Sequence, residues 1–454
     1  METRSVKEKV QSRYLKDKEG YFSEEQRIRT KKESKNMADR VRENLESQNS
    51  RAKTMSYFDE ILGYGGVREA ELKEFREKGG KVVGKLCVMV PDELIVAAGA
   101  KPVRVCTGYY ESVHPANELL GDAGLCPLVK STLGSKMVGS NPLIEQVDMI
   151  VGPATCDGKM KMAEILEDWL PVHMMNVPRV KTGDTTTKLW LEEIKYLKRV
   201  LEDLTGRKIT RRRLLKEIDK WNKAQRAWLE LMEMRKSERP LISGQDALVV
   251  TQASEIDDID RWTKKVINLT AELRQMGKKG LYAGEDGAAR IMISGSPIVF
   301  PNFKIPAVVE ESGGLIVTDE LCTGFRLLAD PVVLDERSSS EAMRAIAERY
   351  FYPCTCPCFA PNDERIKRMK EGIRIFGVEG VIFHTLRGCH LNNLEATKIE
   401  IELRDMGIPM LKLESEYDEG DIEQVRTRVE AFIEMIKARR EAEKKRRKAG
   451  GKDK

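Results

Sequence analysis

Two segments of the chain repeat the same order of features, and this repetition limits the folds that the chain can adopt. "AAGAKPVRVCTGYY" in the first half resembles "ESGGLIVTDELCTGFR" in the second, since each has a helix end, a glycine, a strand and a Cys-Thr-Gly-aromatic sequence. "MIVGPATCDGKMKM" and "VIFHTLRGCHLNNLE" likewise share a strand, a loop with a cysteine and a helix. Alternating strands and helices are typical of α/β folds with parallel sheets. We therefore expect two related α/β halves.

The duplication pairs Cys106 with Cys322, and Cys156 with Cys389. Each of these cysteines comes just after the carboxyl end of an expected strand. In open α/β sheets, ligands bind at that edge. The repeated pattern therefore predicts a binding site near these four cysteines.

The segments around the two halves have helical patterns. "LWLEEIKYLKRVLEDL" carries apolar residues at helical spacing, and Thr210 precedes a second long helical pattern as an expected N-cap. We interpret these helices as covering elements. The expected organisation has five parts: a helical N-terminal segment (1–75), a first α/β domain (76–186), a helical covering region (187–284), a second α/β domain (285–436) and a basic tail (437–454).

The positive charge of the chain is concentrated at its C-terminal end. The formal net charge is +5, yet residues 437–454 hold ten Lys or Arg and three Asp or Glu, so the rest is slightly negative. A nucleic-acid binder should carry its basic excess on a folded face, and we interpret this tail as a frayed helix end in solvent. The sequence shows no 18-residue apolar run and no secretory signal pattern. We expect a cytoplasmic protein with no nucleic-acid or membrane partner.

The nine cysteines are an odd number, which argues against a disulfide framework. In the expected compartment they should stay reduced. "YPCTCPCFAP" places Cys354, Cys356 and Cys358 within five positions. A C-x-C step puts two thiols on the same side of an extended segment, so this stretch can offer sulfur to a metal. The other cysteines in expected loops are Cys126, Cys156, Cys322 and Cys389.

The type of metal follows in part from the spacing of the thiols. Cys87 in "KLCVMV" fits a buried thiol inside a strand, and Cys106 is ambiguous. Structural zinc prefers C-x-x-C pairs on short loops, and the chain has none. Dispersed thiols with only four histidines fit iron–sulfur clusters better. The pattern alone leaves an iron–sulfur cluster, zinc and free core thiols open.

"PDELIVAAGAKPVRV", "CDGKMKM", "LCTGFR" and the cysteine after "GVIFHTLRG" together resemble the 2-hydroxyacyl-CoA dehydratase and benzoyl-CoA reductase family. The resemblance extends from about Lys81 to about Met435. It implies two flavodoxin-like (Rossmann-type) parallel-sheet domains with added helices and an iron–sulfur cluster in the cleft between them. It also implies that Cys126, Cys156 and Cys389 hold a [4Fe–4S] cluster.

The chain has more thiols than one such cluster needs, and in this respect it resembles the branch called double-cubane cluster proteins. In that branch two cubanes share a bridging sulfide, giving an [8Fe–9S] cluster, and each cubane is held by three cysteines. The resemblance implies that Cys322, Cys356 and Cys358 hold the second cubane, with Cys354 in reserve.

The resemblance also implies partners. The chain has no G-x-x-x-x-G-K-[ST] loop, and "GKVVGKL" has the wrong spacing, so we expect no nucleotide bound by this chain. The family implies a separate ATP-hydrolysing activator with its own [4Fe–4S] cluster, which supplies low-potential electrons for the reduction of a small molecule. By analogy with the family's heterodimers we expect a homodimer. Four candidate proton donors flank the cysteines, although each also fits a hydrogen-bonded loop residue: His114, Glu118, His384 and His390.

Two alternatives stay open. The first is a 2-hydroxyacyl-CoA dehydratase or benzoyl-CoA reductase-type subunit with a single [4Fe–4S] cluster, whose open iron binds a CoA thioester. Such enzymes usually pair two different subunits and lack the cysteine triplet. The second is a non-catalytic cluster or zinc scaffold, which would not need a cleft between two α/β halves.

Overall fold

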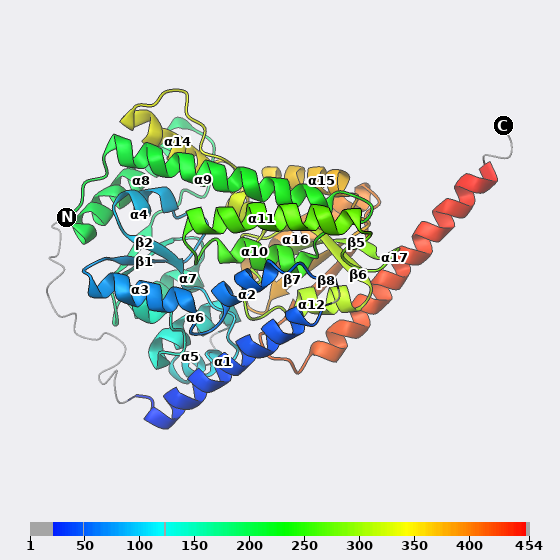
Figure 1. Ribbon diagram of the computed structural model, residues 1–454, viewed down its shortest axis with the longest axis horizontal. Coiled ribbons are helices and arrows are strands. Elements are labelled where there is room, and N and C mark those ends of the chain that lie inside the picture. Colours follow the sequence, from blue (N-terminus) through cyan, green and yellow to red (C-terminus); the bar gives the residue numbers. More distant parts are fainter. Residues whose placement is uncertain (1–20, 49, 122–123, 451–454) are drawn as a thin grey trace.

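Two four-stranded parallel sheets form the centre of the molecule (Figure 1). The computed structural model describes residues 21–48, 50–121 and 124–450, with side chains described as far as residue 446. Both sheets have the same strand order, as the duplication predicts, and this order is the beginning of the flavodoxin-like arrangement. The first sheet runs β2 (Lys101–Arg104), β1 (Val82–Lys85), β3 (Met149–Pro153), β4 (Val172–Met175), and the second runs β6 (Gly314–Glu320), β5 (Ala289–Gly295), β7 (Gly380–Leu386), β8 (Met410–Ser415).

The first strand is shorter than the sequence predicts. The strand in which the sequence analysis places Cys87 ends at Lys85. The Lys85 ammonium pairs with Asp92 at 2.7 Å, and the backbone N–H of Val90 donates to the carbonyl of Cys87 at 3.3 Å. These two contacts turn the chain before it enters α4 (Asp92–Ala97). Cys87 therefore lies in a turn beyond the carboxyl end of β1.

Shorter helices follow the strands in both halves, as in other α/β folds. Three of them, α6, α7 and α16, begin directly after a cysteine. The helices of the first half are α4, α5 (Val113–Leu120), α6 (Pro127–Val138) and α7 (Asp157–Leu166), and those of the second are α12 (Lys304–Glu311), α13 (Phe325–Leu328), α14 (Ser339–Phe351), α15 (Asp363–Phe376) and α16 (His390–Asp405).

The central helices lie against both halves, and α9 and α11 run past both sheets (Figure 1). The expected N-cap at Thr210 is confirmed, because its hydroxyl accepts a hydrogen bond from the backbone N–H of Arg213. Trp190, Trp228 and Trp262 on these helices are fully buried. The central helices are α8 (Asp184–Thr205), α9 (Arg211–Met232), α10 (Gly244–Ala253) and α11 (Ile259–Lys278).

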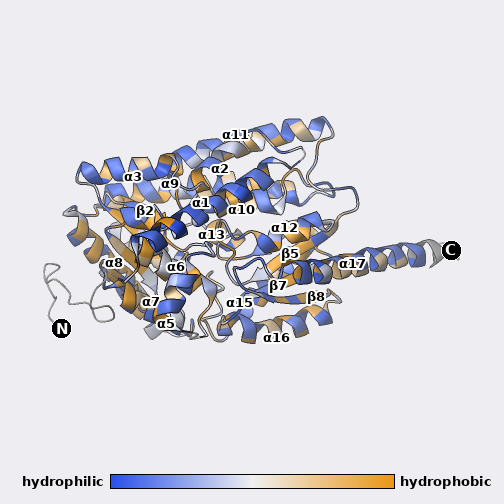
Figure 2. Ribbon diagram, turned by 90° about the horizontal axis from the view of Figure 1, so that it is seen from below, coloured by the Kyte–Doolittle hydropathy of each residue, from blue (hydrophilic) through white to orange (hydrophobic). Residues whose placement is uncertain are grey.

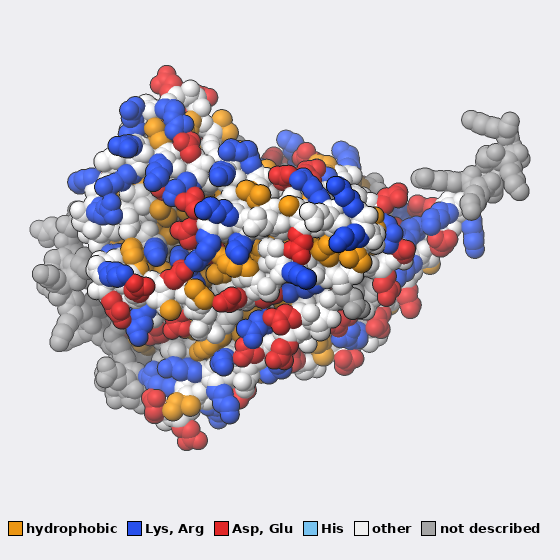
Figure 3. Space-filling model, in the orientation of Figure 1, with side chains coloured by type: hydrophobic (Ala, Val, Ile, Leu, Met, Phe, Trp, Pro, Cys, Tyr) orange, Lys and Arg blue, Asp and Glu red, His pale blue; other side chains and the backbone are white. Residues whose placement is uncertain are grey.

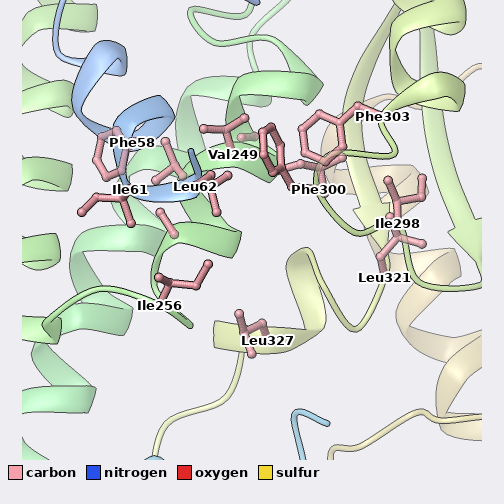
Figure 4. Packing of buried hydrophobic residues seen from close by; sticks show 14 of the residues in the cluster. Phe58, Ile61, Leu62, Val249, Ile256, Ile298, Phe300, Phe303, Leu321 and Leu327 are labelled. Carbon is pink, nitrogen blue, oxygen red and sulfur yellow. The ribbon is translucent and has the colours of Figure 1, made fainter. Parts of the chain in front are cut away.

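One hydrophobic core includes residues of the N-terminal helices, of the central helices and of both α/β halves. Figure 4 shows Phe58 and Leu62 of α2 (Met55–Leu62) near Val249 of α10, with Phe300 and Phe303 beyond it. The other N-terminal helices are α1 (Glu24–Glu46) and α3 (Val67–Glu77). Because the two halves share this core, the carboxyl ends of their strands are held in fixed positions relative to one another. The domain limits given above stay predictions.

The last helix, α17 (Ile422–Gly450), packs only along its first part. Val429, Ile433 and Ile436 are buried, whereas residues 441–446 are exposed. The helix then projects away from the body (Figure 1), and this part is mostly hydrophilic (Figure 2). The expected frayed end is therefore helical as far as Gly450. No helix in the described part of the chain combines the length and apolar character needed to cross a membrane.

Candidate metal centre

A cavity of about 570 Å³ lies where the carboxyl ends of the two sheets face each other. Its wall includes residues that follow β1, β2 and β3 of the first half and β5, β6 and β7 of the second. Sequence positions far apart are thus brought to one space. Eight of the nine cysteines line it: Cys87, Cys106, Cys126, Cys156, Cys322, Cys354, Cys356 and Cys389.

Three of these cysteines are N-caps of helices. Cys126, Cys156 and Cys389 precede α6, α7 and α16. The thiol of Cys156 accepts a hydrogen bond from the backbone N–H of Lys159 at 3.4 Å, and that of Cys389 accepts one from the side-chain amide of Asn392 at 3.3 Å. Helix N-termini stabilise nearby anions and thiolates. These three thiols are therefore placed to hold a negatively charged group.

The loop that carries Cys389 packs closely against the loop that carries Cys126. Gly388 has a positive φ of 78°, and a side chain there would overlap the carbonyl oxygen of Gly124 and lie 3.1 Å from the backbone nitrogen of Cys126. Only glycine adopts such a backbone without strain and leaves room for this approach. The close packing brings ligands of the two halves to the same end of the cavity.

Thr355 holds the cysteine triplet in place by hydrogen bonds to the protein interior. It is fully buried, its hydroxyl donates to Glu320 at 2.8 Å and its carbonyl accepts from the Arg326 guanidinium at 2.7 Å. Because Thr355 points into the protein, its two neighbours, Cys354 and Cys356, are held at the wall. The alternation of thiols with a threonine thus has a structural explanation.

The structure does not bring Cys358, the third cysteine of the triplet, to the cavity. The chain turns after Cys356, whose carbonyl accepts a hydrogen bond from the backbone N–H of Phe359 at 3.1 Å. Cys358 is 5% exposed and belongs to a hydrophobic cluster that includes Phe351. The turn explains why the C-x-C geometry applies to Cys354 and Cys356 rather than to Cys356 and Cys358.

Cys87, which the sequence analysis interpreted as a structural thiol, and Cys106, which it left ambiguous, both lie at the wall. The interpretation of Cys87 as a thiol inside a strand is wrong, because β1 ends two residues earlier and Cys87 lines the cavity. Cys106 follows β2, lines the cavity, and its thiol donates to the carbonyl of Leu86 at 3.7 Å. The apolar residues around Cys87 suggested a strand. The chain turns there instead, because of contacts that the local sequence does not predict.

Burial raises the pKa of four thiols at the wall: Cys106, Cys126, Cys322 and Cys354. It raises the pKa of Cys126 to about 12, with a further increase from Cys389. It also raises the pKa of Cys322 to about 12, with further increases from Cys87 and Cys356. A metal must therefore displace protons when it binds here. These effects give two groups of thiols, one with Cys126, Cys156 and Cys389 and one with Cys87, Cys322, Cys354 and Cys356. Cys106 and Cys358 are also affected by members of the second group.

Cys356 is the exception among these thiols. A hydrogen bond from the Cys358 thiol lowers the pKa of Cys356 to about 6, and the nearby Arg326 contributes to this effect. At neutral pH Cys356 is thus a thiolate at the cavity wall. Cys358 lies away from the wall, and its hydrogen bond stabilises the Cys356 thiolate.

Five Lys or Arg side chains line the wall, and their partners differ: Arg104, Lys159, Arg179, Arg326 and Arg349. Arg104 pairs with Glu255 at 2.7 Å and Arg326 pairs with Glu320 at 3.3 Å. The ammonium of Lys159 donates to the hydroxyl of Thr155 at 2.7 Å. Within residues 21–48, 50–121 and 124–450, no carboxylate lies within 4.0 Å of that ammonium.

The structure brings one of the four predicted proton donors to the cavity. His390 lines it. His384 is buried in β7, away from the wall, shares a hydrogen bond with Ser415 at 2.9 Å, and burial lowers its pKa to about 3. His114 and Glu118 are exposed on α5. His390 therefore stays the one candidate of the four with access to the cavity.

A buried acid and a tyrosine form a pair that the sequence analysis missed. The hydroxyl of Tyr350, which lines the cavity, donates to the carboxylate of Glu93 at 2.7 Å. Glu93 is 1% exposed, and burial raises its pKa. The two residues are 257 positions apart, so no local pattern connects them. The signal that the sequence offers is the place of Glu93 in the "PDEL" segment.

The donors fit a cluster of several irons better than a single ion. In the part of the chain that the structure describes, no three His, Cys, Asp or Glu side chains are arranged to hold one metal ion. A structural zinc ion needs four ligands within about 2.3 Å. Here all nine thiols are free of disulfides, and eight stand around a shared cavity. Cysteine thiolates are the ligands that hold iron–sulfur clusters.

Comparisons with known proteins show the family of the chain. A protein of Escherichia coli (strain K12) named "Putative dehydratase subunit YjiM" is 32% identical over 365 residues, which are 80% of this chain and 93% of that protein. The beta subunit of (R)-2-hydroxyglutaryl-CoA dehydratase from Acidaminococcus fermentans is 24% identical, covering 80% and 95%, and a benzoyl-CoA reductase subunit from Thauera aromatica is 22% identical, covering 79% and 91%. The model of the family "2-hydroxyglutaryl-CoA dehydratase, D-component" matches residues 87–436. The chain therefore belongs to the family of 2-hydroxyacyl-CoA dehydratase and benzoyl-CoA reductase subunits.

Proposed function

We propose that the protein is an iron–sulfur reductase component that receives low-potential electrons from an ATP-hydrolysing activator protein and reduces a small molecule at a double-cubane [8Fe–9S] cluster. The observation that carries the proposal is the set of eight thiols around one cavity. A single [4Fe–4S] cluster uses at most four cysteines. A pair of bridged cubanes, each with three cysteine ligands, accounts for most of the set.

The two groups of thiols supply the ligands. Cys126, Cys156 and Cys389 hold one cubane at three helix N-termini. For the second cubane we replace Cys358 by Cys87, because Cys87 is at the wall and Cys358 is not. Cys354 stays in reserve. The proposed ligands are Cys126, Cys156 and Cys389 for one cubane, and Cys87, Cys322 and Cys356 for the other.

The residues of this chain prepare the cavity for reduction of a small molecule. The cluster would store electrons at low potential when bound. The largely apolar wall limits the access of water, which strengthens the electrostatic effect of nearby charges. Burial raises the pKa of Glu93, which favours its protonated form, and its hydrogen bond to Tyr350 leads to the cavity. His390 is a second source of protons.

The first test is the metal content of the protein purified without oxygen. We expect about eight irons per chain and more sulfide than two ordinary cubanes contain. About four irons would favour the alternative subunit that acts on a CoA thioester. About one zinc without labile sulfide would contradict both functions and indicate a scaffold.

Single substitutions test the ligand set. We expect Cys87→Ala to lose about half of the iron, because one cubane loses a ligand. Cys358→Ala should keep the full iron content, since its thiol is away from the wall. The reverse result would show that Cys358, not Cys87, is the ligand. Full iron in both variants would contradict a second cubane held by these residues.

The source of the electrons is tested separately. The isolated protein should neither hydrolyse ATP nor become reduced by it. Addition of the purified activator should start ATP hydrolysis and reduction of the cluster together, measured by electron paramagnetic resonance. Reduction of the protein with ATP but without an activator would contradict this part of the proposal.

A further inference from the structure

Lys159 is a cation at the cavity wall whose charge has no carboxylate partner among the described residues. It is the third residue of α7, which begins directly after the N-cap Cys156. Its ammonium donates one hydrogen bond, to Thr155, which is 4% exposed. An ammonium has three donors. Among the described residues Thr155 is its hydrogen-bond acceptor, so two donors are free for a group in the cavity.

Lys159 lines the same cavity as thiols of both groups, among them Cys87, Cys156 and Cys356. Its backbone N–H donates to the thiol of Cys156 at 3.4 Å. A lysine side chain carries a positive charge at neutral pH. Cys156 belongs to one proposed cubane, and Cys87 and Cys356 belong to the other, so the charge is near both.

The arginines of the wall are compensated in two ways. Glu255 neutralises Arg104 and Glu320 neutralises Arg326, whereas Arg179 and Arg349 donate to backbone carbonyls. Lys159 has a single hydroxyl acceptor instead, and a charge removed from water is unfavourable unless a counter-ion or hydrogen bonds compensate it. For Lys159 the missing compensation has to come from an anion inside the cavity.

We propose that Lys159 supplies the counter-charge of the iron–sulfur cofactor and sets its reduction potential, because a fixed positive charge beside thiols of both groups favours the reduced and more negative form. Net charge and hydrogen bonds to sulfur are two of the properties that determine cluster potentials. The step is the addition of one electron from the activator to the cofactor, without a bond formed or broken. The inference rests on the proposed function only in requiring an iron–sulfur cofactor in this cavity.

The test compares midpoint potentials of purified holoproteins in dye-mediated titrations. Lys159→Met keeps the length of the side chain and removes its charge, whereas Lys159→Arg keeps the charge. We expect at least a tenfold lower equilibrium constant for reduction in Lys159→Met, which is about 59 mV for a one-electron couple. Lys159→Arg should stay within a threefold change of the wild type.

A lysine on the same helix provides the control. Lys161 has a side-chain exposure of 72% and pairs with Glu164 at 2.9 Å, outside the cavity wall. Lys161→Met removes the same charge from solvent, where water screens it. It should leave the potential unchanged. An equal shift in Lys161→Met and Lys159→Met would overturn the proposal, since the effect would then be one of net charge alone.

Iron content separates this inference from the proposed function. Wild-type protein without iron and sulfide would contradict the proposed function. Full iron with an unchanged potential in Lys159→Met would overturn the inference alone. If Lys159→Met holds less iron, the midpoint potentials of Lys159→Gln and Lys159→Arg are compared instead. The proposal requires that only the Arg variant keeps the wild-type potential, and equal potentials in the two variants would refute it.

Discussion

At the scale of single residues, His384 shows how burial decides whether a side chain can serve in acid–base chemistry. It is 3% exposed in β7, and burial, aided by the charge of Lys304, lowers its pKa from 6.5 to about 3. The native protein therefore keeps His384 neutral where the unfolded chain already binds a proton. The corresponding stability is complete above pH 6.5 and is lost as the pH falls towards 3, by about 1.4 kcal/mol per pH unit.

A substitution checks this pH dependence. We expect His384→Gln to lose less stability than the wild type between pH 7.5 and pH 5.5, by roughly 1 kcal/mol. Urea unfolding at the two pH values measures the difference, and His114→Gln, on the exposed face of α5, is the matched control. A variant with the same pH dependence as the wild type would show that His384 is protonated in the native state.

Residue positions could be predicted from the sequence where the signal is local. Cys156 and Cys389 were expected after strands because the duplication repeats strand, loop, cysteine and helix. Cys87 could not be placed, because a contact between Lys85 and Asp92 helps to end its strand. The partner of Glu93 could not be found either, since Tyr350 is 257 residues away.

At the scale of elements, the local periodicity predicts the two sheets, and the repeated strand order confirms the duplication. The approach of the two loops at Gly388 is different, since it arises only when both halves pack together. The sequence "RGC" predicts a turn but not its neighbour. Loop contacts of this kind depend on tertiary structure, so the shape of the cavity was beyond sequence reasoning.

Gly388→Ala tests the importance of this contact. The positive φ alone should cost roughly 1 kcal/mol, and the overlap with Gly124 should add to it and reduce the iron content. Gly206→Ala is the control, because Gly206 also has a positive φ of 67° but no neighbouring atom within 4 Å of the added carbon. Thermal unfolding and iron analysis should show a larger loss for Gly388→Ala. Equal losses would show that the loops can move apart without effect.

At the scale of the whole molecule, one chain supplies every thiol that the structure places at the cavity wall. No second type of polypeptide is needed to complete the proposed ligand set. By analogy with the paired subunits of the family, we therefore expect a dimer of identical chains. Native mass spectrometry under anaerobic conditions should give twice the chain mass of 51.5 kDa. A monomer, or a stable complex with a different dehydratase-like protein, would contradict this expectation.

The projecting end of α17 makes the molecule electrically asymmetric. Residues 437–446 contain six Lys or Arg against two Glu, while both signs of charge are mixed on the face of the body in view (Figure 3). The excess of positive charge on the projecting helix gives the protein a permanent dipole moment along that helix. At physiological ionic strength the Debye length is about 8 Å, so this field acts over short range. The dipole moment therefore influences how the molecule orients only once another charged surface is within a few water layers.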